Sequence, residues 1–273
     1  MRRLLLALLG WIAATSAVLA VEPVDLELVL AVDISGSVDE DEARLQRQGY
    51  VSALTDPDVL KAIRTGLNGR IAVAYFEWSG PESRRLLLNW TVIEDEGTAR
   101  AAAARLAESP IISGLSTSIS GAIEFALPLY GRSYQGARRV LDISGDGPNN
   151  SGQLVTPPRA QALDRGITIN GLPIVNNRPN RTGFPQLPDL DLYYQHCVIG
   201  GPGAFVIVAE GFDAFAEAIR RKMIIEIADL APPRPRRAET GPIRRVAQDY
   251  PPGCDVGERQ SREFWQRRYN SPD

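Results

Sequence analysis

The chain has 273 residues, of which 44% are hydrophobic and 23% are charged, as in an ordinary globular protein. Its formal net charge of −3 lacks the basic excess that marks nucleic-acid-binding domains. The length suffices for one large domain or two small ones. We therefore expect a folded protein that does not bind nucleic acid.

Residues 1–20 have the pattern of a secretory signal peptide. Met1 is followed by two arginines, residues 4–14 are apolar, and Ala20 is a small residue suited to cleavage. The apolar run is too short to cross a membrane stably, and no second long apolar run follows it in the sequence. We expect an exported protein, periplasmic or secreted, without a stable membrane span; an uncleaved anchor is the alternative.

Residues 26–32 predict a strand that is buried on both faces, because nearly all of them are apolar and many are branched. This strand ends on Asp33. Ser35 and Ser37 follow, with Gly36 between them to permit a tight bend. Three oxygen-bearing side chains so close in sequence can converge on one point. Oxygen ligands suit magnesium, manganese or calcium, and do not suit zinc or copper.

Strand and helix patterns alternate along the rest of the chain. Apolar runs predict further strands at residues 71–78, 84–92, 138–144, 167–175 and 204–209. Helical patterns occur near residues 39–54, 59–64, 95–107, 117–130, 157–165, 189–197 and 212–227. Pro128 should kink or end its helix, and the short turn before residue 84 favours an antiparallel hairpin. The prediction is an α/β fold, a doubly wound, mostly parallel six-stranded sheet with helices on both faces.

Two later segments add oxygen ligands at the same sheet edge. Asp146 follows the fourth strand, which should lie beside the first strand, and Thr117 opens a helix. In such sheets, ligands bind beyond the carboxyl ends of the strands, where the strand order reverses. We expect one cation site, with one coordination position open and some ligands acting through water, formed by Asp33, Ser35, Ser37, Thr117 and Asp146.

These three motifs resemble the metal-ion-dependent adhesion site (MIDAS) of a von Willebrand factor type A (vWFA) domain. They are Asp-Ile-Ser-Gly-Ser, a threonine that opens an Ala-Ile helix, and Gly-Asp-Gly after a strand. The resemblance covers about residues 24–230, and it implies the Rossmann-like vWFA fold. Residues 144–150 and 197–201 resemble an exported bacterial branch that is known only as a domain of unknown function.

The resemblance also implies a role for each ligand and a kind of partner. Ser35 and Ser37 would coordinate directly, and Thr117 directly or through water. Asp33 and Asp146 would act mostly through water and through bonds to the other ligands. The cation would be Mg²⁺, or Mn²⁺ or Ca²⁺, and the carboxylate of a partner would fill its sixth position.

The sequence departs from the family pattern at two positions. Gly145 stands where a threonine is usual, and Asp142 lies within the fourth strand where an apolar residue is usual. Asp142 shares one strand face with Ser144 and Asp146. Asp142 could brace the metal site from behind, but a buried acid satisfied by backbone donors is the commoner arrangement.

Acidic and amide residues flank the expected site. Asn149 and Asn150 follow the metal aspartate, so they should lie at its rim, either in contact with a partner or in a turn role. Glu40 and Asp41 could form a second cation site. Acidic residues in the first turn of a helix are more simply explained by the helix dipole.

The C-terminal part changes in character at Pro232, where a proline- and arginine-rich run begins. We expect one vWFA-like domain at residues 21–231 and an extended surface arm at residues 232–273. In an exported protein, the cysteines Cys197 and Cys254 should form a disulfide that tethers this arm. Two free thiols are the alternative.

The sequence therefore indicates an exported, metal-dependent binding module of the adhesion type, and not an enzyme. Its expected partner is an unidentified protein or envelope ligand that presents a carboxylate. His196 is the only histidine, and neither a Gly-x-Ser-x-Gly elbow nor a phosphate-binding glycine loop occurs. Two alternatives are a metal-dependent hydrolase such as a phosphoesterase, and a structural envelope protein with an empty site.

Overall fold

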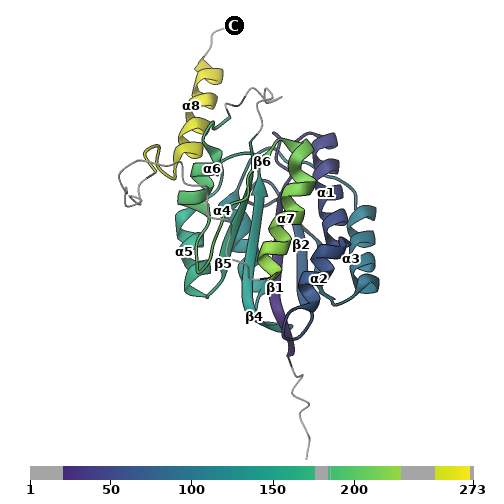
Figure 1. The fold of residues 1–273 in the computed structure, drawn as a ribbon. Helices are drawn as coiled ribbons and strands as arrows, with labels where there is room; N and C mark the ends of the chain where they lie inside the picture. The colour runs from purple at the N-terminus through teal and green to yellow at the C-terminus, as the bar shows by residue number, and fades with distance from the viewer. Residues whose placement is uncertain (1–20, 176–183, 185, 229–249, 271–273) are drawn as a thin grey trace, which may run out of the picture.

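A computed structural model describes residues 21–175, 184, 186–228 and 250–270, so the expected signal peptide lies outside the described residues. The sheet in this part of the chain has six strands in the order β3-β2-β1-β4-β5-β6 (Figure 1). The strands are β1 (Glu22–Asp33), β2 (Ile71–Trp78), β3 (Arg84–Ile93), β4 (Tyr134–Gly145), β5 (Thr168–Val175) and β6 (Ala209–Glu210). Only β3 runs antiparallel to its neighbour, as a hairpin with β2. The predicted mostly parallel α/β sheet is confirmed.

Helices cover both faces of the sheet (Figure 1). One face carries α1 (Glu40–Leu54), α2 (Pro57–Arg64), α3 (Glu96–Glu108) and α7 (Phe215–Ala228). The other face carries α4 (Ile119–Ala126), α5 (Thr156–Asp164) and α6 (Leu190–Tyr193). None of the described helices is long and apolar enough to cross a membrane.

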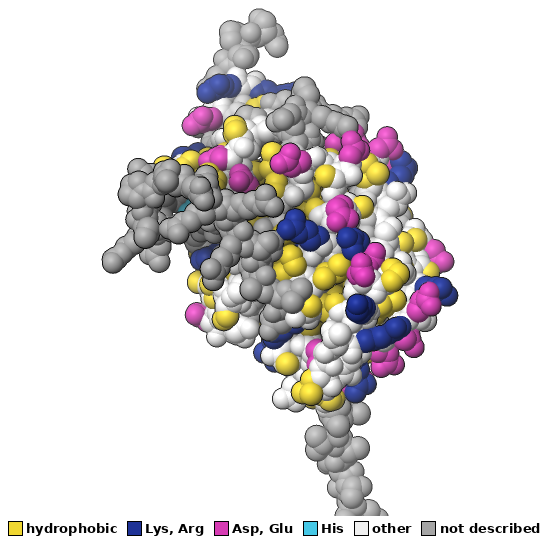
Figure 2. All heavy atoms as spheres, viewed as in Figure 1, with side chains coloured by type: hydrophobic (Ala, Val, Ile, Leu, Met, Phe, Trp, Pro, Cys, Tyr) yellow, Lys and Arg dark blue, Asp and Glu magenta, His cyan; other side chains and the backbone are white. Residues whose placement is uncertain are grey.

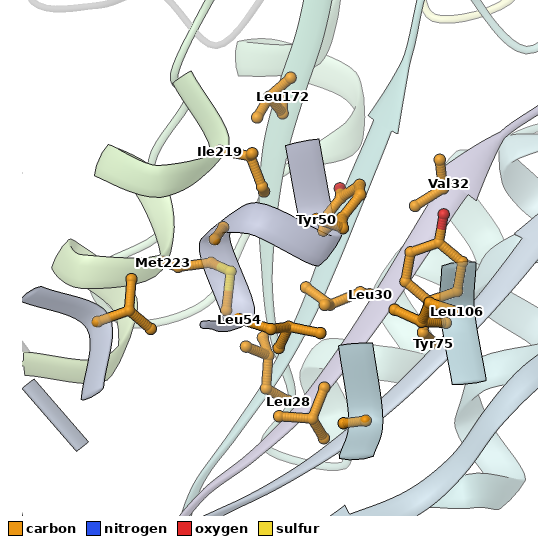
Figure 3. Packing of buried hydrophobic residues seen from close by; sticks show 14 of the residues in the cluster. Leu28, Leu30, Val32, Tyr50, Leu54, Tyr75, Leu106, Leu172, Ile219 and Met223 are labelled. Atoms are coloured by element: carbon orange, nitrogen blue, oxygen red, sulfur yellow. The ribbon is translucent and has the colours of Figure 1, made fainter. Parts of the chain in front are cut away.

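The central strand β1 explains this layering, because its side chains alternate between two apolar cores. Leu28 and Leu30 point into the core beneath α1 and α7, whereas Val29 and Ala31 point into the core beneath α4. Figure 3 shows the first core, where Tyr50 of α1 lies among residues of β1, β2 and α7. The Tyr50 ring meets that of Tyr75 edge to face at 5.2 Å. Burial on both faces holds the carboxyl end of β1 in a fixed position.

The sixth strand is much shorter than the expected residues 204–209. Asn170 of β5 explains the difference, because its side-chain oxygen accepts the backbone N–H of Phe205 at 3.1 Å. In a regular parallel sheet this N–H would donate to a backbone carbonyl of β5, but here it donates to a side chain instead. Pairing is then limited to a bridge at Val206 and the two residues of β6.

The C-terminal part differs most from the expectation of an extended arm. Residues 229–249 lie outside the described residues, but residues 256–270 form the helix α8 (Val256–Asn270). Ion pairs at helical spacing, such as Arg259 with Asp255 and Arg267 with Glu263, support this helix. Cys197 and Cys254 form the predicted disulfide, with their Cα atoms 5.5 Å apart.

Charged side chains of both signs are interspersed on the visible face of the molecule, as Figure 2 shows. Some of them pair across one helical turn, as Arg44 does with Glu40 and Asp41 on α1. Such pairs contribute little to stability because solvent screens them. The charges that matter for stability are the buried ones.

A fully buried ionic cluster lies between β4 and α7. The ammonium of Lys222 lies 2.6 Å from Asp142 Oδ1 and 2.5 Å from Glu226 Oε1. Asp142 is thus paired with a side chain of α7; it is neither a brace of the metal site nor satisfied by backbone donors. Burial raises the pKa of Asp142 to about 7, while Lys222 lowers it and Glu226 raises it.

We predict that Lys222→Met destabilises the fold by about 3–5 kcal/mol at pH 8, because it leaves two buried carboxylates without a cation. Urea unfolding of the variant and the wild type would measure this loss. The deficit should shrink at pH 5, because the carboxyl of Asp142, whose pKa is raised to about 7, can be neutral there. The control is Arg221→Met, at the neighbouring exposed position on α7. An equal loss in the two variants would contradict the ionic account.

Candidate metal site

The loop after β1 is fixed at both ends. Asp33 is fully buried at the end of the strand, and its Oδ1 accepts the backbone N–H of Ser35 at 2.7 Å. Gln46 of α1 donates to the carbonyl oxygen of Asp33 at 3.2 Å. At the other end, Asp39 and Glu42 form a capping box that starts α1. The loop can therefore hold its hydroxyl groups in one arrangement.

A second loop packs directly against the first. The N–H of Gly114 donates to the carbonyl of Ile34 at 2.9 Å. A Cβ on Gly36 would lie 3.2 Å from the carbonyl oxygens of Gly114 and Leu115, so a larger residue would push the two loops slightly apart. This contact brings Thr117, just before α4, to the end of β1.

Two asparagines attach the third loop, which follows β4, to the start of α4. Thr117 and Asn150 exchange two hydrogen bonds of 2.9 Å, in which each backbone N–H donates to an oxygen of the other residue. Asn149 accepts the N–H of Ser120 at 2.9 Å. Three chain segments that are distant in sequence are thus joined by specific polar contacts beside Asp146.

The hydroxyl and carboxylate groups of the three loops form one chain of contacts. Ser37 donates to Asp146 Oδ1 at 2.5 Å, and its oxygen lies 3.2 Å from that of Ser35. Thr117 donates to the Ser35 hydroxyl at 3.1 Å. The structure therefore brings together the side chains of Ser35, Ser37, Thr117 and Asp146, with Asp33 bonded to the backbone of Ser35.

The charges of this cluster fit a divalent cation. Burial raises the pKa of Asp33 well above its usual value, and the charge of Asp146 raises it further. Burial also raises the pKa of Asp146 to about 6, against the lowering effect of the Ser37 hydroxyl. Asp33 Oδ2 is buried and has no hydrogen-bond partner among the residues that the structure describes. Two buried carboxylates without a counter-charge are costly, and a bound cation would supply that charge.

The donor types indicate which cations fit. The cluster offers two carboxylates and three hydroxyls, a set suited to hard cations such as Mg²⁺, Mn²⁺ or Ca²⁺. No group of three or more His, Cys, Asp or Glu side chains in the described part of the chain is placed to hold a metal ion, so the hydroxyls are an essential part of this donor set. Ser35, Ser37, Thr117, Asp33 and Asp146 would hold the ion.

Tyr194, which the sequence did not single out, explains the glycine before Asp146. A Cβ on Gly145 would lie 2.9 Å from Asp33 Oδ2 and 2.9 Å from the hydroxyl of Tyr194. Tyr194 lies in the π-helical turn Tyr194–Val198, and its buried hydroxyl has no partner among the described residues. The phenol therefore occupies space where the family pattern has a threonine side chain. In the sequence, the only signal for this contact was the glycine at position 145, which indicated that another side chain could fill the space of the usual threonine.

Asn149, Glu40 and Asp41, which the sequence places beside the metal residues, do not line the site itself. Asn149 is 0% exposed and donates to Gln153 and Glu258, so the expected rim position is corrected for this residue. Glu40 and Asp41 pair with Arg44 on the exposed side of α1. Their place in the first helical turn agrees with a dipole role.

The cluster opens into a pocket of about 580 Å³ between the metal loops and α8. Its floor includes Ser37, Thr117 and Asp146, and Asn150 lies on its wall. His196 is not among the lining residues; it stacks on Tyr250 at 6.2 Å. The pocket offers a route by which an outside group could reach the cation.

Comparisons with known proteins agree with this architecture. The family model described as "Protein of unknown function (DUF1194)" matches residues 23–231. The pilus adhesin SpaC from Lactobacillus rhamnosus GG has a TM-score of 0.55 at 16% identity, over 77% of this chain and 31% of that chain. Proximal thread matrix protein 1 from the mussel byssus, with a zinc-occupied MIDAS motif, has a TM-score of 0.53 at 12% identity, over 76% and 47%.

A von Willebrand factor type A protein from Catenulispora acidiphila gives a TM-score of 0.49 at 15% identity, over 75% of this chain and 43% of that chain. This chain thus spans less than half of the length of each of these three proteins. No curated protein matches the sequence. At these identities, the likeness concerns the fold alone.

We predict different effects of alanine on the stability of the fold at two nearby glycines. Gly145→Ala should destabilise the fold by about 1–3 kcal/mol, because its Cβ would crowd Asp33 and Tyr194. Gly147→Ala is the matched control, since its Cβ would meet nothing closer than 3.8 Å, and it should be neutral or slightly stabilising. Adding Tyr194→Phe should recover part of the Gly145→Ala loss. Thermal unfolding would measure all three, and strict additivity of the double variant would contradict the contact.

We also predict that the affinity for Mg²⁺ falls below about pH 6, because a proton on Asp146 competes with the cation. Above pH 7 the carboxylate of Asp146 is ionised, so a proton on this residue no longer competes with the cation. Calorimetry at pH 7.5 and pH 5.0, in two buffers of different ionisation enthalpy, would measure the affinity and the protons released. Asp41→Asn, which removes an exposed carboxylate of α1, should leave the pH profile unchanged. A constant affinity over this range would contradict the prediction.

Proposed function

The chain belongs to the family described as "Protein of unknown function (DUF1194)" and has the fold of vWFA domains, and we propose that it is an exported binding module. In this proposal, a divalent cation, Mg²⁺ in the first place, recruits an acidic group of a partner. The partner is a protein or envelope ligand that presents a carboxylate. No chemical conversion of the partner is involved.

One observation carries the proposal: two buried carboxylates and three hydroxyls form one cluster, and Ser37, Thr117 and Asp146 of this cluster line an open pocket. Mg²⁺ prefers six oxygen ligands and keeps water molecules readily. When bound, the cation would supply positive charge and an exchangeable coordination position. If the hydroxyls of Ser35, Ser37 and Thr117 are its direct ligands, little of its charge is neutralised, and it attracts a further carboxylate.

The surrounding contacts prepare the site before any ligand arrives. Asp33 orders the first loop through the N–H of Ser35, and Asp146 orients the hydroxyl of Ser37. Thr117 is held by Asn150, so the second loop cannot withdraw from the other two without breaking these bonds. Such preorganisation reduces the entropy lost on binding.

The nearby carboxylates favour binding over hydrolysis. Glu42, which lies close enough to raise the pKa of Asp146, bonds the N-cap amide of Asp39. Asp142 is held by Lys222, and Glu258 accepts a hydrogen bond from Asn149. These acids have structural roles, whereas metal-dependent hydrolysis would need a free base beside the ion.

The expected signal peptide and the disulfide support export, because disulfides persist in oxidising compartments. An adhesion role also agrees with the nature of two structural relatives, one a pilus adhesin and one a byssus matrix protein. These roles are known for the relatives, which are more than twice as long as the stretch matched here.

We predict that the wild type binds Mg²⁺ and that Asp33→Ala lowers the affinity at least tenfold, because one of the two buried carboxylates is removed. Asp41→Ala, which removes an exposed carboxylate of α1, is the matched control and should bind normally. Calorimetry would measure both. Binding of an immobilised peptide with a single Asp should require Mg²⁺ and should be lost when that Asp is replaced by Asn. Equal binding of the two peptides, or of either peptide in chelator, would overturn the proposed function.

A further inference from the structure

The helix α8 forms one wall of the pocket above the metal residues. Four of its residues line the pocket: Ser261, Phe264, Trp265 and Arg268. Their spacing of three, four and seven residues places them on one face of the helix. This helix therefore borders the pocket through which Ser37, Thr117 and Asp146 can be reached from solvent.

Specific contacts fix α8 to the loop that carries Asp146. Asn149 donates to Glu258 Oε1 at 2.7 Å. A Cβ on Gly257 would lie 2.1 Å from the carbonyl oxygen of Asn149, so the helix backbone packs directly on this loop. Val256 is buried in the core, and Cys254 is bonded to Cys197. The position of α8 relative to the metal residues is thus determined at its N-terminal end.

The pocket-facing side of α8 is aromatic. The ring of Phe264 meets those of Phe184 at 5.5 Å and Trp265 at 5.3 Å, both edge to face. Trp265 is nevertheless 49% exposed, and Leu115 on the opposite loop is 94% exposed. Large apolar side chains left uncovered around a pocket mark a place where another molecule binds.

The charge on this wall is positive. Arg268 has no ion-pair partner among the described residues, whereas Arg259 and Arg267 of the same helix pair with Asp255 and Glu263. A cation on the floor and Arg268 on the wall would together attract a group that carries more than one negative charge. The volume of about 580 Å³ exceeds what a single carboxylate needs.

We propose that this pocket binds an acidic peptide segment in which an aromatic residue neighbours the carboxylate that reaches the cation. The inference rests on the proposed function and adds a specificity surface to it. The aromatic side chain packs against Phe264 and Trp265, and a second acidic group of the segment pairs with Arg268. A peptide suits the wall better than an acidic sugar, because rings that meet edge to face accept a further aromatic ring.

The test uses three synthetic peptides, Gly-Phe-Asp-Glu-Gly, Gly-Ala-Asp-Glu-Gly and Gly-Phe-Asn-Glu-Gly, with residues 21–273 in the oxidised form. In Mg²⁺, the first peptide should bind about tenfold tighter than the second, since burial of one aromatic side chain contributes that much. The third peptide should lose most of this affinity. Galacturonate is the competing sugar acid, and it should displace the first peptide no better than acetate does.

Variants of α8 separate the two parts of the wall. Trp265→Ala should reduce the preference for Phe over Ala to less than threefold, and Gln266→Ala is the exposed control on the same helix. Arg268→Ala should weaken all Asp-containing peptides and reduce their salt dependence, with Arg262→Ala as the control of equal charge. All four variants should keep the wild-type affinity for Mg²⁺ in calorimetry.

The outcomes distinguish this inference from the proposed function. If Mg²⁺ does not bind, or if Asp and Asn peptides bind equally, the metal-dependent binding role itself fails. If Asp and Mg²⁺ are required but Phe and Ala peptides bind equally, the role of α8 alone is overturned. Tighter peptide binding by Trp265→Ala, or preferential displacement by galacturonate, would also overturn it.

Discussion

Asp33 and Asp146 lie together, buried, at the carboxyl ends of adjacent parallel strands. Burial raises the pKa of both groups, and their mutual repulsion raises that of Asp33 further. With raised pKa values, the folded state binds protons more tightly than the unfolded state does. The stability that Asp146 contributes is therefore present at low pH and is lost as the pH rises through about 6, and that of Asp33 is lost as the pH rises through its own raised pKa. At neutral pH a divalent cation can take the place of the protons, which ties the stability of this sheet edge to the proposed ligand.

The rest of the domain keeps these two carboxylates in place. The strand β1 is covered on both faces, and hydrogen bonds from Gln46 and from the N–H of Ser35 hold Asp33. On the neighbouring strand, Lys222 neutralises Asp142, which pairs in register with Leu30 and so lies further from the sheet edge than Asp33 does. The protein thus handles two sets of buried acids differently. Asp142 is paired with Lys222, whereas neither Asp33 nor Asp146 forms an ion pair with a lysine or arginine among the residues that the structure describes.

The sequence was sufficient for features that depend on local pattern. The apolar residues of β1 and the oxygen-bearing residues after it predicted a strand end with a metal loop, and the alternation of elements predicted the sheet. Features that depend on packing between distant segments could not be predicted in this way. No local sequence pattern indicates the contact of Tyr194 with Gly145 or that of Lys222 with Asp142, because the two residues of each pair are distant in sequence and meet only in the folded chain. The helix α8 was missed because the proline- and arginine-rich run before it suggested that the whole tail was extended.

The short loop after β4 connects the metal site with the C-terminal helix. Asp146 faces the hydroxyl of Ser37, and three residues later Asn149 turns inward to bond Ser120 on one side and Glu258 on the other. A movement of this loop would therefore displace both the residues that would bind the cation and the helix α8. The helix α8 also carries the aromatic and basic residues of the pocket wall. The residues that would hold the ion and those that would select its partner are therefore both positioned by the loop after β4. The disulfide between Cys197 and Cys254 joins the residues just before α8 to the turn that contains Tyr194, whose hydroxyl lies beside Asp33.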